Sequence, residues 1–509
     1  MSDVAARPHV DRPMSDLTPR PYEVVIGIEC HVELATASKM FCPCSARWFG
    51  APPNTLVCPV CLGLPGALPV PNRRAIELAI TAGIALHCDT PAHTKFDRKN
   101  YLYPDLPKGY QISQYDLPLS VGGWLEIPAD GGGTKRVGIR RAHLEEDTGR
   151  LLHGEELGTR YTLVDFNRSG VPLLEIVSEP DLSSTAEALR YVQALREIVV
   201  GVGVSEFRLE EGAGRFDTNV SIRFTEAGET RWPPLSEIKN LNSYRSLEEA
   251  ATYEADRLWK EWQAGGDLRR RTSKITVGWS QARSETFLQR TKEDVDDYRY
   301  FPEPDLVALA PDPAMVAALR AGLPELPAER RARFVADYGL SDYDARVLVA
   351  ERALADWYEA GVRAAPAGQA KAVANWVTSE LLGALKRDGV ALADARVTPA
   401  RLAALVGLIA SGAISGKIAK DVFAEMLRSG DEPAAIVGAR GLAQVSDEGA
   451  IVAVVDAVIT ENPKVVADYT GGNPRALGAL VGAVQKKMAG KANPALVNRL
   501  LAERIARVA

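Results

Sequence analysis

The chain has 509 residues, enough for about three domains, and its 46% hydrophobic and 25% charged residues are ordinary for a globular protein. No apolar stretch approaches the roughly 18 residues of a membrane-spanning helix, so we expect a cytoplasmic protein that does not enter a membrane. The net charge of −6 at pH 7 argues against broad electrostatic binding of nucleic acid, but it permits a shaped contact with RNA through local basic patches.

The N-terminal part is expected to pass from a disordered extension into a β-strand. Residues 1–21 contain charged residues and prolines, without the apolar run that is typical of a signal peptide. Over residues 22–34, apolar and polar residues then alternate. Because side chains point alternately to the two faces of a strand, this pattern places Glu29, His31 and Glu33 together on one face.

Four of the six cysteines form two close pairs, Cys42 with Cys44 and Cys58 with Cys61. Each pair can supply two metal ligands from one turn, and the loop between the pairs contains Gly, Pro and Asn residues that allow it to fold back. This arrangement predicts a closed, tetrahedral, structural zinc site. The alternatives are four unrelated buried cysteines, or disulfides, for which nothing else in the sequence indicates an oxidising compartment.

The segment Lys95–Gln114 interleaves cations with aromatic residues and prolines. This composition suits a rigid loop that grips a phosphate and a flat ring, although a surface loop with extended lysines is an alternative. The sequence contains no complete Walker A motif and no Gly-x-Gly-x-x-Gly after a strand. A nucleotide would therefore have to bind on a platform of strands and carboxylates.

Three further segments predict strands that carry polar residues. Residues 137–147 and 216–223 alternate like the first strand, and residues 173–177 hold Glu175 within an apolar run. In each of the two alternating segments, the pattern places four polar residues on one face: Arg141, His143, Glu145 and Asp147 in the first, and Asp217, Asn219, Ser221 and Arg223 in the second. Glu146 faces the other way. In another short segment, Glu237 and Lys239 flank the apolar Ile238. A solvated sheet face would explain such patterns, but an unpaired charge inside an apolar run is costly. Converging carboxylates would repel each other unless a cation held them, which favours a magnesium site.

The composition changes after the proline-rich segment Phe301–Asp305, which marks a domain boundary. Beyond it Ala, Leu, Val, Arg and Glu dominate, and apolar residues recur with helical spacing. We therefore expect an α+β domain over residues 22–311, a helical domain over 312–434 and a small helical tail domain over 435–509.

Several long motifs occur in a fixed order from Tyr22 onward. They are I-G-I-E-C-H-V-E from Ile26, C-P-V-C-L-G-L-P-G-A-L-P from Cys58, K-F-D-R-K-N-Y from Lys95, H-L-E-E-D from His143, L-E-I-V-S-E-P-D from Leu174, E-I-K-N-L-N-S from Glu237 and D-Y-R-Y-F-P-E-P-D-L from Asp297. With these motifs the chain strongly resembles the GatB family, the synthetase subunits of the aspartyl/glutamyl-tRNA amidotransferases, over nearly its whole length.

The resemblance implies a glutamine-synthetase-like cradle domain with an antiparallel sheet, a helical domain and a helical tail domain that contacts tRNA. The implied activity uses ATP to phosphorylate the side-chain carboxylate of Glu or Asp mischarged on tRNA(Gln) or tRNA(Asn). Ammonia then displaces the phosphate to give the amide. Glutamine hydrolysed in a separate glutaminase subunit would supply the ammonia through a tunnel, and a small third subunit would brace the pair in a heterotrimer.

The resemblance also implies roles for particular residues. Those that would coordinate magnesium or line its site are Glu29, His31, Glu145, Glu146, Glu175 and Asp217. Lys99 would lie in the ammonia path or near the phosphates, and with Glu29, His31, Glu146 and Glu175 it makes up the expected catalytic set. The four cysteines match the zinc-bearing branch of the family.

In the tail domain, five basic residues surround two expected helices and would grip tRNA. They are Lys486, Lys487, Lys491, Arg499 and Arg504. An ordinary solvated helix face is the alternative for this set. The alternative for the whole chain is a non-catalytic zinc-ribbon RNA-binding protein whose carboxylates form a solvated sheet face.

Overall fold

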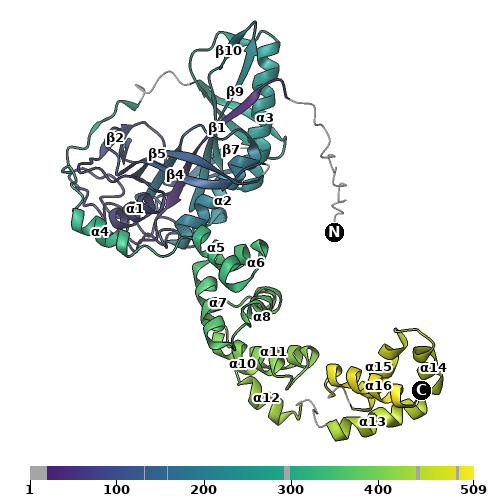
Figure 1. Cartoon of the computed structure of the whole chain (residues 1–509). Coiled ribbons are helices and arrows are strands. Elements are labelled where there is room, and N and C mark those ends of the chain that lie inside the picture. The colour runs from purple at the N-terminus through teal and green to yellow at the C-terminus, as the bar shows by residue number, and fades with distance from the viewer. Residues whose placement is uncertain are drawn as a thin grey trace. The chain divides into compact units, whose positions relative to one another are not determined.

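A computed structural model describes residues 20–130, 132–156, 159–291, 298–442, 448–488 and 492–508. The expected N-terminal extension lies almost wholly outside these residues. The chain divides into two compact units, of which the first ends at Leu326 and the second begins at Pro327 (Figure 1).

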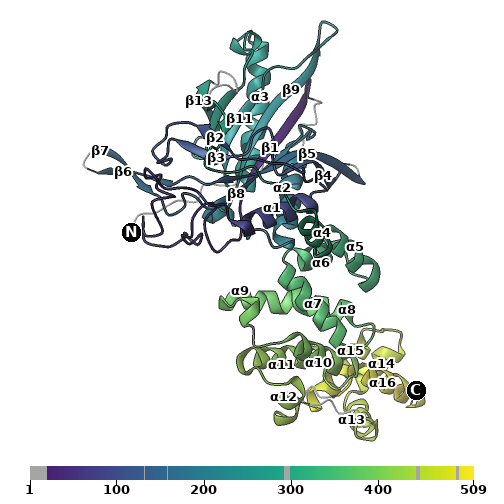
Figure 2. The same cartoon turned by 90° about the vertical axis from the view of Figure 1, so that its left-hand side faces the viewer.

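Within the described residues, a nine-stranded sheet forms the centre of the first unit (Figure 2). Its strands follow the order β13-β12-β11-β9-β1-β8-β5-β4, and β10 pairs with β9 beside this path. The strands are β1 (Glu23–Glu33), β4 (Ser120–Pro128), β5 (Thr134–Glu146), β8 (Pro172–Ser178), β9 (Gly214–Glu226), β10 (Glu229–Arg231), β11 (Ser236–Leu241), β12 (Ile275–Ser280) and β13 (Glu285–Thr291).

The sheet is mixed, whereas the resemblance implied an antiparallel one. β11 and β12 pair in parallel, while the other pairings between the described strands of the sheet are antiparallel. The helix α3 (Tyr244–Gln263) connects these two strands. A connection of that length can carry the chain back to the end of the sheet at which β11 began. Two consecutive strands that pair in parallel require such a crossover.

Three helices pack on the apolar face of this sheet. α1 (Arg73–Ala85) and α2 (Thr185–Gly201) contact β4, and α3 contacts β9. The apolar residues of β1 are buried in the resulting core, as the alternation predicted. The opposite face of β1 therefore presents its polar residues.

A β-bulge in β5 changes which of its residues face the core. The register with β8 shifts between Ile139 and Arg141. The core residues of this strand are Val137 and Ile139 before the shift and Ala142 and Leu144 after it. Since a bulge inserts one extra residue on one strand, the core positions change from odd to even numbers. The odd-numbered His143 and Glu145 therefore lie on the polar face.

The described part of the first unit also contains two smaller sheets and a fourth α-helix. The strands of the smaller sheets are β2 (Asp97–Asn100), β3 (Tyr110–Ser113) and β14 (Phe301–Pro302) in one and β6 (Arg150–Glu156) and β7 (Thr159–Asp165) in the other. The helix α4 (Pro313–Ala321) packs Met315 and Leu319 against the core of this unit. The predicted boundary at residue 312 thus precedes a helix that belongs with the sheet.

The second unit consists of helices around two cores. The helices of the first core are α5 (Pro327–Tyr338), α6 (Asp342–Val349), α7 (Arg352–Ala364), α8 (Ala370–Asn375), a π-helical segment (Trp376–Leu381), α9 (Leu382–Asp388), α10 (Pro399–Ala410), α11 (Gly416–Ser429) and α12 (Pro433–Ala439). The helices of the second core are α13 (Glu448–Glu461), α14 (Pro463–Thr470), α15 (Ala476–Lys487) and α16 (Pro494–Val508). Ile436 and Val437 of α12 belong to the first core, so the predicted boundary at 435 falls inside a helix. In the part of the chain that the structure describes, no helix is both long and apolar enough to cross a membrane.

Candidate active site

Three neighbouring strands bring one histidine pair and two carboxylates together on the polar face. His31 of β1 is directly opposite Glu175 of β8, which in turn is opposite His143 of β5. Oε2 of Glu175 lies 3.4 Å from Nε2 of His31 and 3.5 Å from Nε2 of His143. Glu145 joins them, with its Oε1 atom 3.8 Å from Nε2 of His31. His31, Glu145 and Glu175 each offer one ligand atom within 4.8 Å of the others, so this cluster could hold a metal ion.

Burial and mutual contact shift the pKa values of these groups. Burial lowers the pKa of His143 to about 4. Burial also acts to lower the pKa of His31, but its hydrogen bond with Glu175 raises the pKa overall. Burial and the charge of Glu175 raise the pKa of Glu145. For Glu175 burial opposes ionisation, but the two histidines and Lys99 hold its pKa well below the usual range. The two carboxylates compete for the same positive charge, and a divalent cation would relieve this competition.

A second carboxylate cluster lies next to the first on the polar face of β1. Glu29 is directly opposite Asp217 of β9, and both lie within 4.8 Å of Glu237 of β11, measured between ligand oxygens. Nζ of Lys239 is 2.5 Å from Oδ2 of Asp217 and 2.5 Å from Oε1 of Glu237. One ammonium therefore already neutralises part of this cluster. Asn219 donates a hydrogen bond of 3.0 Å from Nδ2 to Oε1 of Glu29.

Glu237 was not among the predicted ligands. Its signal in the sequence was the same as that of Glu175, a carboxylate beside an apolar residue in a short strand segment. The single convergence of carboxylates that the sequence predicted is thus divided into two adjacent clusters, which share the polar face of β1.

Lys99 of β2 supplies a cation beside the first cluster. Although burial acts to lower it, the pKa of Lys99 is raised above its usual value by the charges of Glu145 and Glu175, among others. Nζ of Lys99 lies 5.2 Å from the ring centroid of Tyr298. The charges of the two carboxylates therefore hold the ammonium charged, and an aromatic ring lies near it.

Glu146 does not join the other expected ligands. Alternation along β5 turns it to the face opposite Glu145, where its Oε1 atom accepts a hydrogen bond of 3.0 Å from the backbone N–H of Ile112 and forms an ion pair with Lys108. Its backbone oxygen accepts a hydrogen bond of 2.8 Å from Nε2 of Gln111. Among the described residues, Glu146 belongs to neither carboxylate cluster. These contacts indicate that it anchors β3 and the adjoining loop.

The four paired cysteines come together as their spacing predicted. The sulfur atoms of Cys42, Cys44, Cys58 and Cys61 all lie within 4.8 Å of one another, and none forms a disulfide. In a tetrahedral site with Zn–S bonds of about 2.3 Å, neighbouring sulfurs are roughly 3.8 Å apart. The Sγ atoms of Cys58 and Cys61 are 3.9 Å apart. The donor set and its spacing therefore fit zinc.

Three of the five basic residues expected to grip tRNA form ion pairs with carboxylates of their own domain. Lys487 lies 2.5 Å from Glu461, measured from Nζ to Oε1, and Arg499 lies 3.2 Å from Glu448, measured from Nη2 to Oε1. Arg504 forms a two-pronged ion pair with Asp456. Lys486 lies in the last turn of α15, and Lys491 lies outside the described residues. The predicted grip on tRNA would require these exposed pairs to open, which costs little because such pairs contribute little stability.

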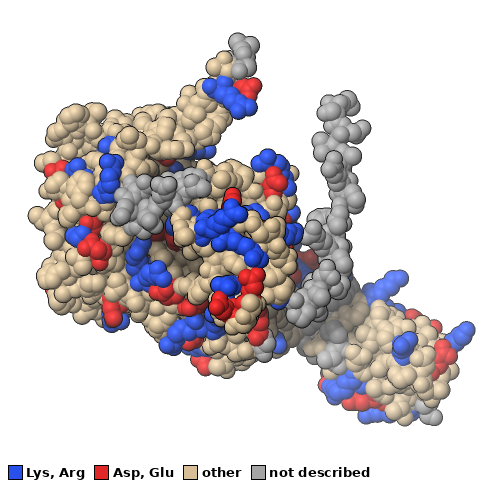
Figure 3. Space-filling model, turned by 90° about the horizontal axis from the view of Figure 1, so that it is seen from above, with Lys and Arg blue, Asp and Glu red and all other residues tan. Residues whose placement is uncertain are grey.

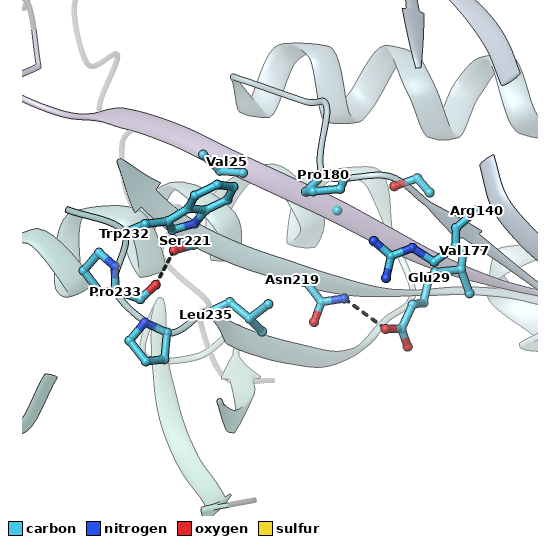
Figure 4. Close-up of a pocket in the computed structure, with 13 residues that line it drawn as sticks. Val25, Glu29, Arg140, Val177, Pro180, Asn219, Ser221, Trp232, Pro233 and Leu235 are labelled. Atoms are coloured by element: carbon cyan, nitrogen blue, oxygen red, sulfur yellow. Dashed lines mark hydrogen bonds between the residues drawn. The ribbon is translucent and has the colours of Figure 1, made fainter. Parts of the chain in front are cut away.

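A pocket adjoins Glu29 on the polar face. In the space-filling view the first unit is hollowed, with both acidic and basic side chains around the hollow (Figure 3). The pocket has a cavity volume of about 400 Å³, with Trp232 and Pro233 at one end and Arg140 and Glu29 at the other (Figure 4). Neither Trp232 nor Arg140 was predicted from the sequence, because neither belongs to a motif whose spacing indicates a site.

Known proteins resemble the chain over both units. A family model described as the GatB/GatE catalytic domain matches residues 24–317, and a model described as the GatB domain matches residues 356–505. A protein of Thermomicrobium roseum, named as the B subunit of aspartyl/glutamyl-tRNA(Asn/Gln) amidotransferase, is 51% identical over 482 residues, which cover 95% of this chain and 98% of that protein. A protein of the same name from Carboxydothermus hydrogenoformans is 49% identical over 490 residues, covering 96% of this chain and all of that protein. The chain therefore belongs to the GatB family, whose catalytic domain its first unit contains.

Proposed function

We propose that this chain is the synthetase subunit of an amidotransferase, which converts Glu-tRNA(Gln), Asp-tRNA(Asn) or both into the correctly amidated aminoacyl-tRNA. The observation that carries the proposal is the buried cluster of His31, Glu145 and Glu175 beside the cation Lys99. A non-catalytic RNA-binding protein would have no use for carboxylates that are this deeply buried and this close together.

The proposed reaction has two steps. A side-chain carboxylate oxygen of the mischarged amino acid attacks the γ-phosphorus of ATP, and the bond to ADP breaks to leave an acyl phosphate. Ammonia then attacks the acyl carbon, phosphate leaves, and the nitrogen loses a proton to give the amide. Phosphoryl transfer of this kind depends on positioning and on neutralising charge, rather than on covalent help from the protein.

The side chains of the first cluster suit these requirements. His31, Glu145 and Glu175 would hold magnesium, which supplies charge neutralisation for the phosphates when it is bound. This donor set fits a cation, because burial and the charge of Glu175 raise the pKa of Glu145. A bound cation would stabilise the ionised form of both carboxylates. Lys99 would stabilise the charge that develops on the transferred group. The surrounding burial would protect an acyl phosphate from water.

For Glu29 and Asp217 we propose that they serve the metal site through the second cluster, which they form with Glu237. The charge of Lys239 already compensates part of that cluster, so a cation there would have to displace or share the ammonium. We therefore assign the first magnesium to the first cluster. For Glu146 we propose a supporting role instead of the predicted ligand role.

The wider assembly follows from the family. We propose that a glutaminase subunit delivers ammonia to this site, and that a small third subunit would complete a cytoplasmic heterotrimer. The first unit would act as a glutamine-synthetase-like cradle. The four cysteines would hold a structural zinc ion, and the tail domain would contact the tRNA through Lys486, Lys487, Lys491 and Arg499.

The test is amide formation by the assembled complex. Purified chain is combined with its partner subunits, mischarged tRNA, glutamine, ATP and magnesium, and both the amidated aminoacyl-tRNA and ADP are measured. Formation of amide that requires ATP and magnesium supports the proposal. Binding of tRNA without ATP consumption would instead favour the non-catalytic alternative.

A further inference from the structure

A buried lysine lies beside the four-cysteine site. Lys39 precedes Cys42 by three residues, and its side chain is fully buried. Its Nζ atom donates to backbone oxygens, and no carboxylate among the described residues forms an ion pair with it. An ammonium that is taken out of water is costly unless negative charge lies nearby. The burial of Lys39 therefore requires another source of negative charge.

Hydrogen bonds from Lys39 reach both cysteine pairs. Its backbone N–H donates to the carbonyl oxygen of Cys44 over 2.9 Å. Its Nζ atom donates to the carbonyl oxygen of Leu56 over 2.8 Å, and Leu56 lies two residues before Cys58. One residue thus holds the turn of the first pair and the start of the second pair, at opposite ends of the loop that separates them.

The aliphatic stem of Lys39 runs next to Cys61. Both side chains border Gly170, where a Cβ atom would lie 3.5 Å from Cδ of Lys39 and 3.4 Å from Cβ of Cys61. The Nζ atom also donates to the carbonyl oxygen of Phe166 over 3.3 Å. The ammonium is therefore enclosed by the cysteine-bearing loop and by the segment that precedes β8.

The four cysteines would carry more negative charge than one zinc ion neutralises. Zinc binds cysteine as the thiolate, so four thiolates leave two negative charges after the ion is bound. Cys42 and Cys61 are buried, where uncompensated charge is costly. The hydrogen bond with Cys42 is the main cause that lowers the pKa of Cys61 to about 4, and the charge of Lys39 acts in the same direction while burial opposes it. The ammonium and the thiolates thus each supply the charge that the other lacks.

The alternative role for Lys39 is that of a purely structural tether. The same loop already has a neutral tether, because Asn167 accepts a hydrogen bond of 2.8 Å from the N–H of Leu56 and donates one of 2.7 Å to the carbonyl oxygen of Pro52. A neutral amide satisfies such backbone groups without the cost of burying a charge. The charge of Lys39 is therefore explained better by the thiolates than by the loop.

We propose that Lys39 is a positioning residue of the four-cysteine site, where its ammonium offsets the excess negative charge of the zinc-bound thiolates and holds the two cysteine pairs together. The proposal rests on the zinc ion of the proposed function and adds to it a residue that is not a ligand. Partners of this kind, which contact the ligands instead of the metal, typically contribute a factor of about 10 to 100 to metal affinity.

The test compares the full-length wild type with Lys39→Met, which keeps an unbranched stem and removes the ammonium. Competition with a chelator measures the Kd for zinc, and circular dichroism reports whether the protein is folded. Lys39→Met should weaken zinc binding about tenfold to a hundredfold. The matched control is Lys135→Met, which removes a partly buried lysine that pairs with Glu187 of α2 and should leave the Kd for zinc unchanged.

A second readout separates the charge of Lys39 from its packing. Cobalt replaces zinc in such sites and gives sulfur-to-metal charge-transfer absorption. Without the ammonium the thiolate electrons are held less tightly, so this absorption should move to longer wavelength in Lys39→Met and stay in place in Lys135→Met. If Lys39→Met does not fold, Lys39→Gln provides the same comparison with a shorter side chain that keeps a neutral donor.

The outcomes distinguish this inference from the zinc assignment itself. If wild-type protein binds zinc, and a folded Lys39 variant binds it within about twofold of the wild type with an unshifted cobalt spectrum, Lys39 is only a structural lysine and the inference is overturned. The same holds if the variant loses thermal stability alone. If wild-type protein binds no zinc, the zinc assignment of the proposed function fails, and this inference fails with it.

Discussion

His31 and Glu175 face each other across β1 and β8, with Nε2 of the histidine 3.4 Å from Oε2 of the carboxylate. The contact raises the pKa of His31 even though burial acts to lower it. It also helps to hold Glu175 ionised in a position where burial opposes the charge. This pair is the centre of the proposed magnesium site.

Replacing Glu175 by Gln should strongly reduce amidation. The variant keeps the size of the side chain but removes one of the two negative charges that would hold the cation, and we expect the amidation rate to fall about 10²- to 10³-fold. The measurement is amide formation on mischarged tRNA by the complex. Glutamine hydrolysis by the glutaminase partner, assayed in the same preparation, should be unchanged. An amidation rate close to that of wild type would remove Glu175 from the metal site.

The adjacent residues Glu145 and Glu146 should respond differently to the same substitution. Glu145→Gln should reduce amidation and weaken its dependence on magnesium, because Glu145 belongs to the cluster with His31. Glu146→Gln should mainly lower the free energy of unfolding, by roughly 3 kcal/mol, because it leaves the Lys108 ammonium without its buried partner. Denaturant unfolding and a magnesium titration of activity separate the two effects. Equal magnesium dependence in both variants would contradict the assignment of Glu146 to a supporting role.

The four cysteines should bind about one zinc ion per chain. Elemental analysis of purified protein measures this directly. Cys58→Ser should lower the zinc content and destabilise the first unit, because zinc binding to such a site contributes to folding. Cys88→Ser is a suitable control, since Cys88 is a buried cysteine outside the cluster. Folded wild-type protein that contains no metal would refute the zinc assignment.

A fragment that ends at Leu326 should be more stable and more soluble than one that ends at residue 311. The shorter fragment lacks α4, whose residues Met315, Val316 and Leu319 pack against the core of the first unit. Loss of this cover exposes apolar surface, which promotes aggregation. Thermal unfolding and gel filtration of the two fragments make the comparison. Identical behaviour would show that α4 contributes little to this unit.

Much of the site could be predicted from the sequence, because alternation in a strand is a local property. The period of two placed Glu29 and His31 on the face of β1 opposite its buried residues, and the spacing of the cysteines predicted that their sulfurs would meet. Alternation also separated Glu145 from Glu146, although the resemblance to the family led us to expect both at the metal.

Other features depended on pairing between distant segments. The order of the strands decided that Glu29 meets Asp217 and Glu237, and that His31 meets Glu175 and Glu145. The bulge in β5 decided that Arg141, His143 and Glu145 share the polar face with β1. Neither the register between strands nor the position of a bulge is encoded in the spacing of nearby residues, because both result from packing contacts between segments far apart in the chain. The sequence by itself therefore determined which residues could serve the site, and only the tertiary structure decided which of them meet.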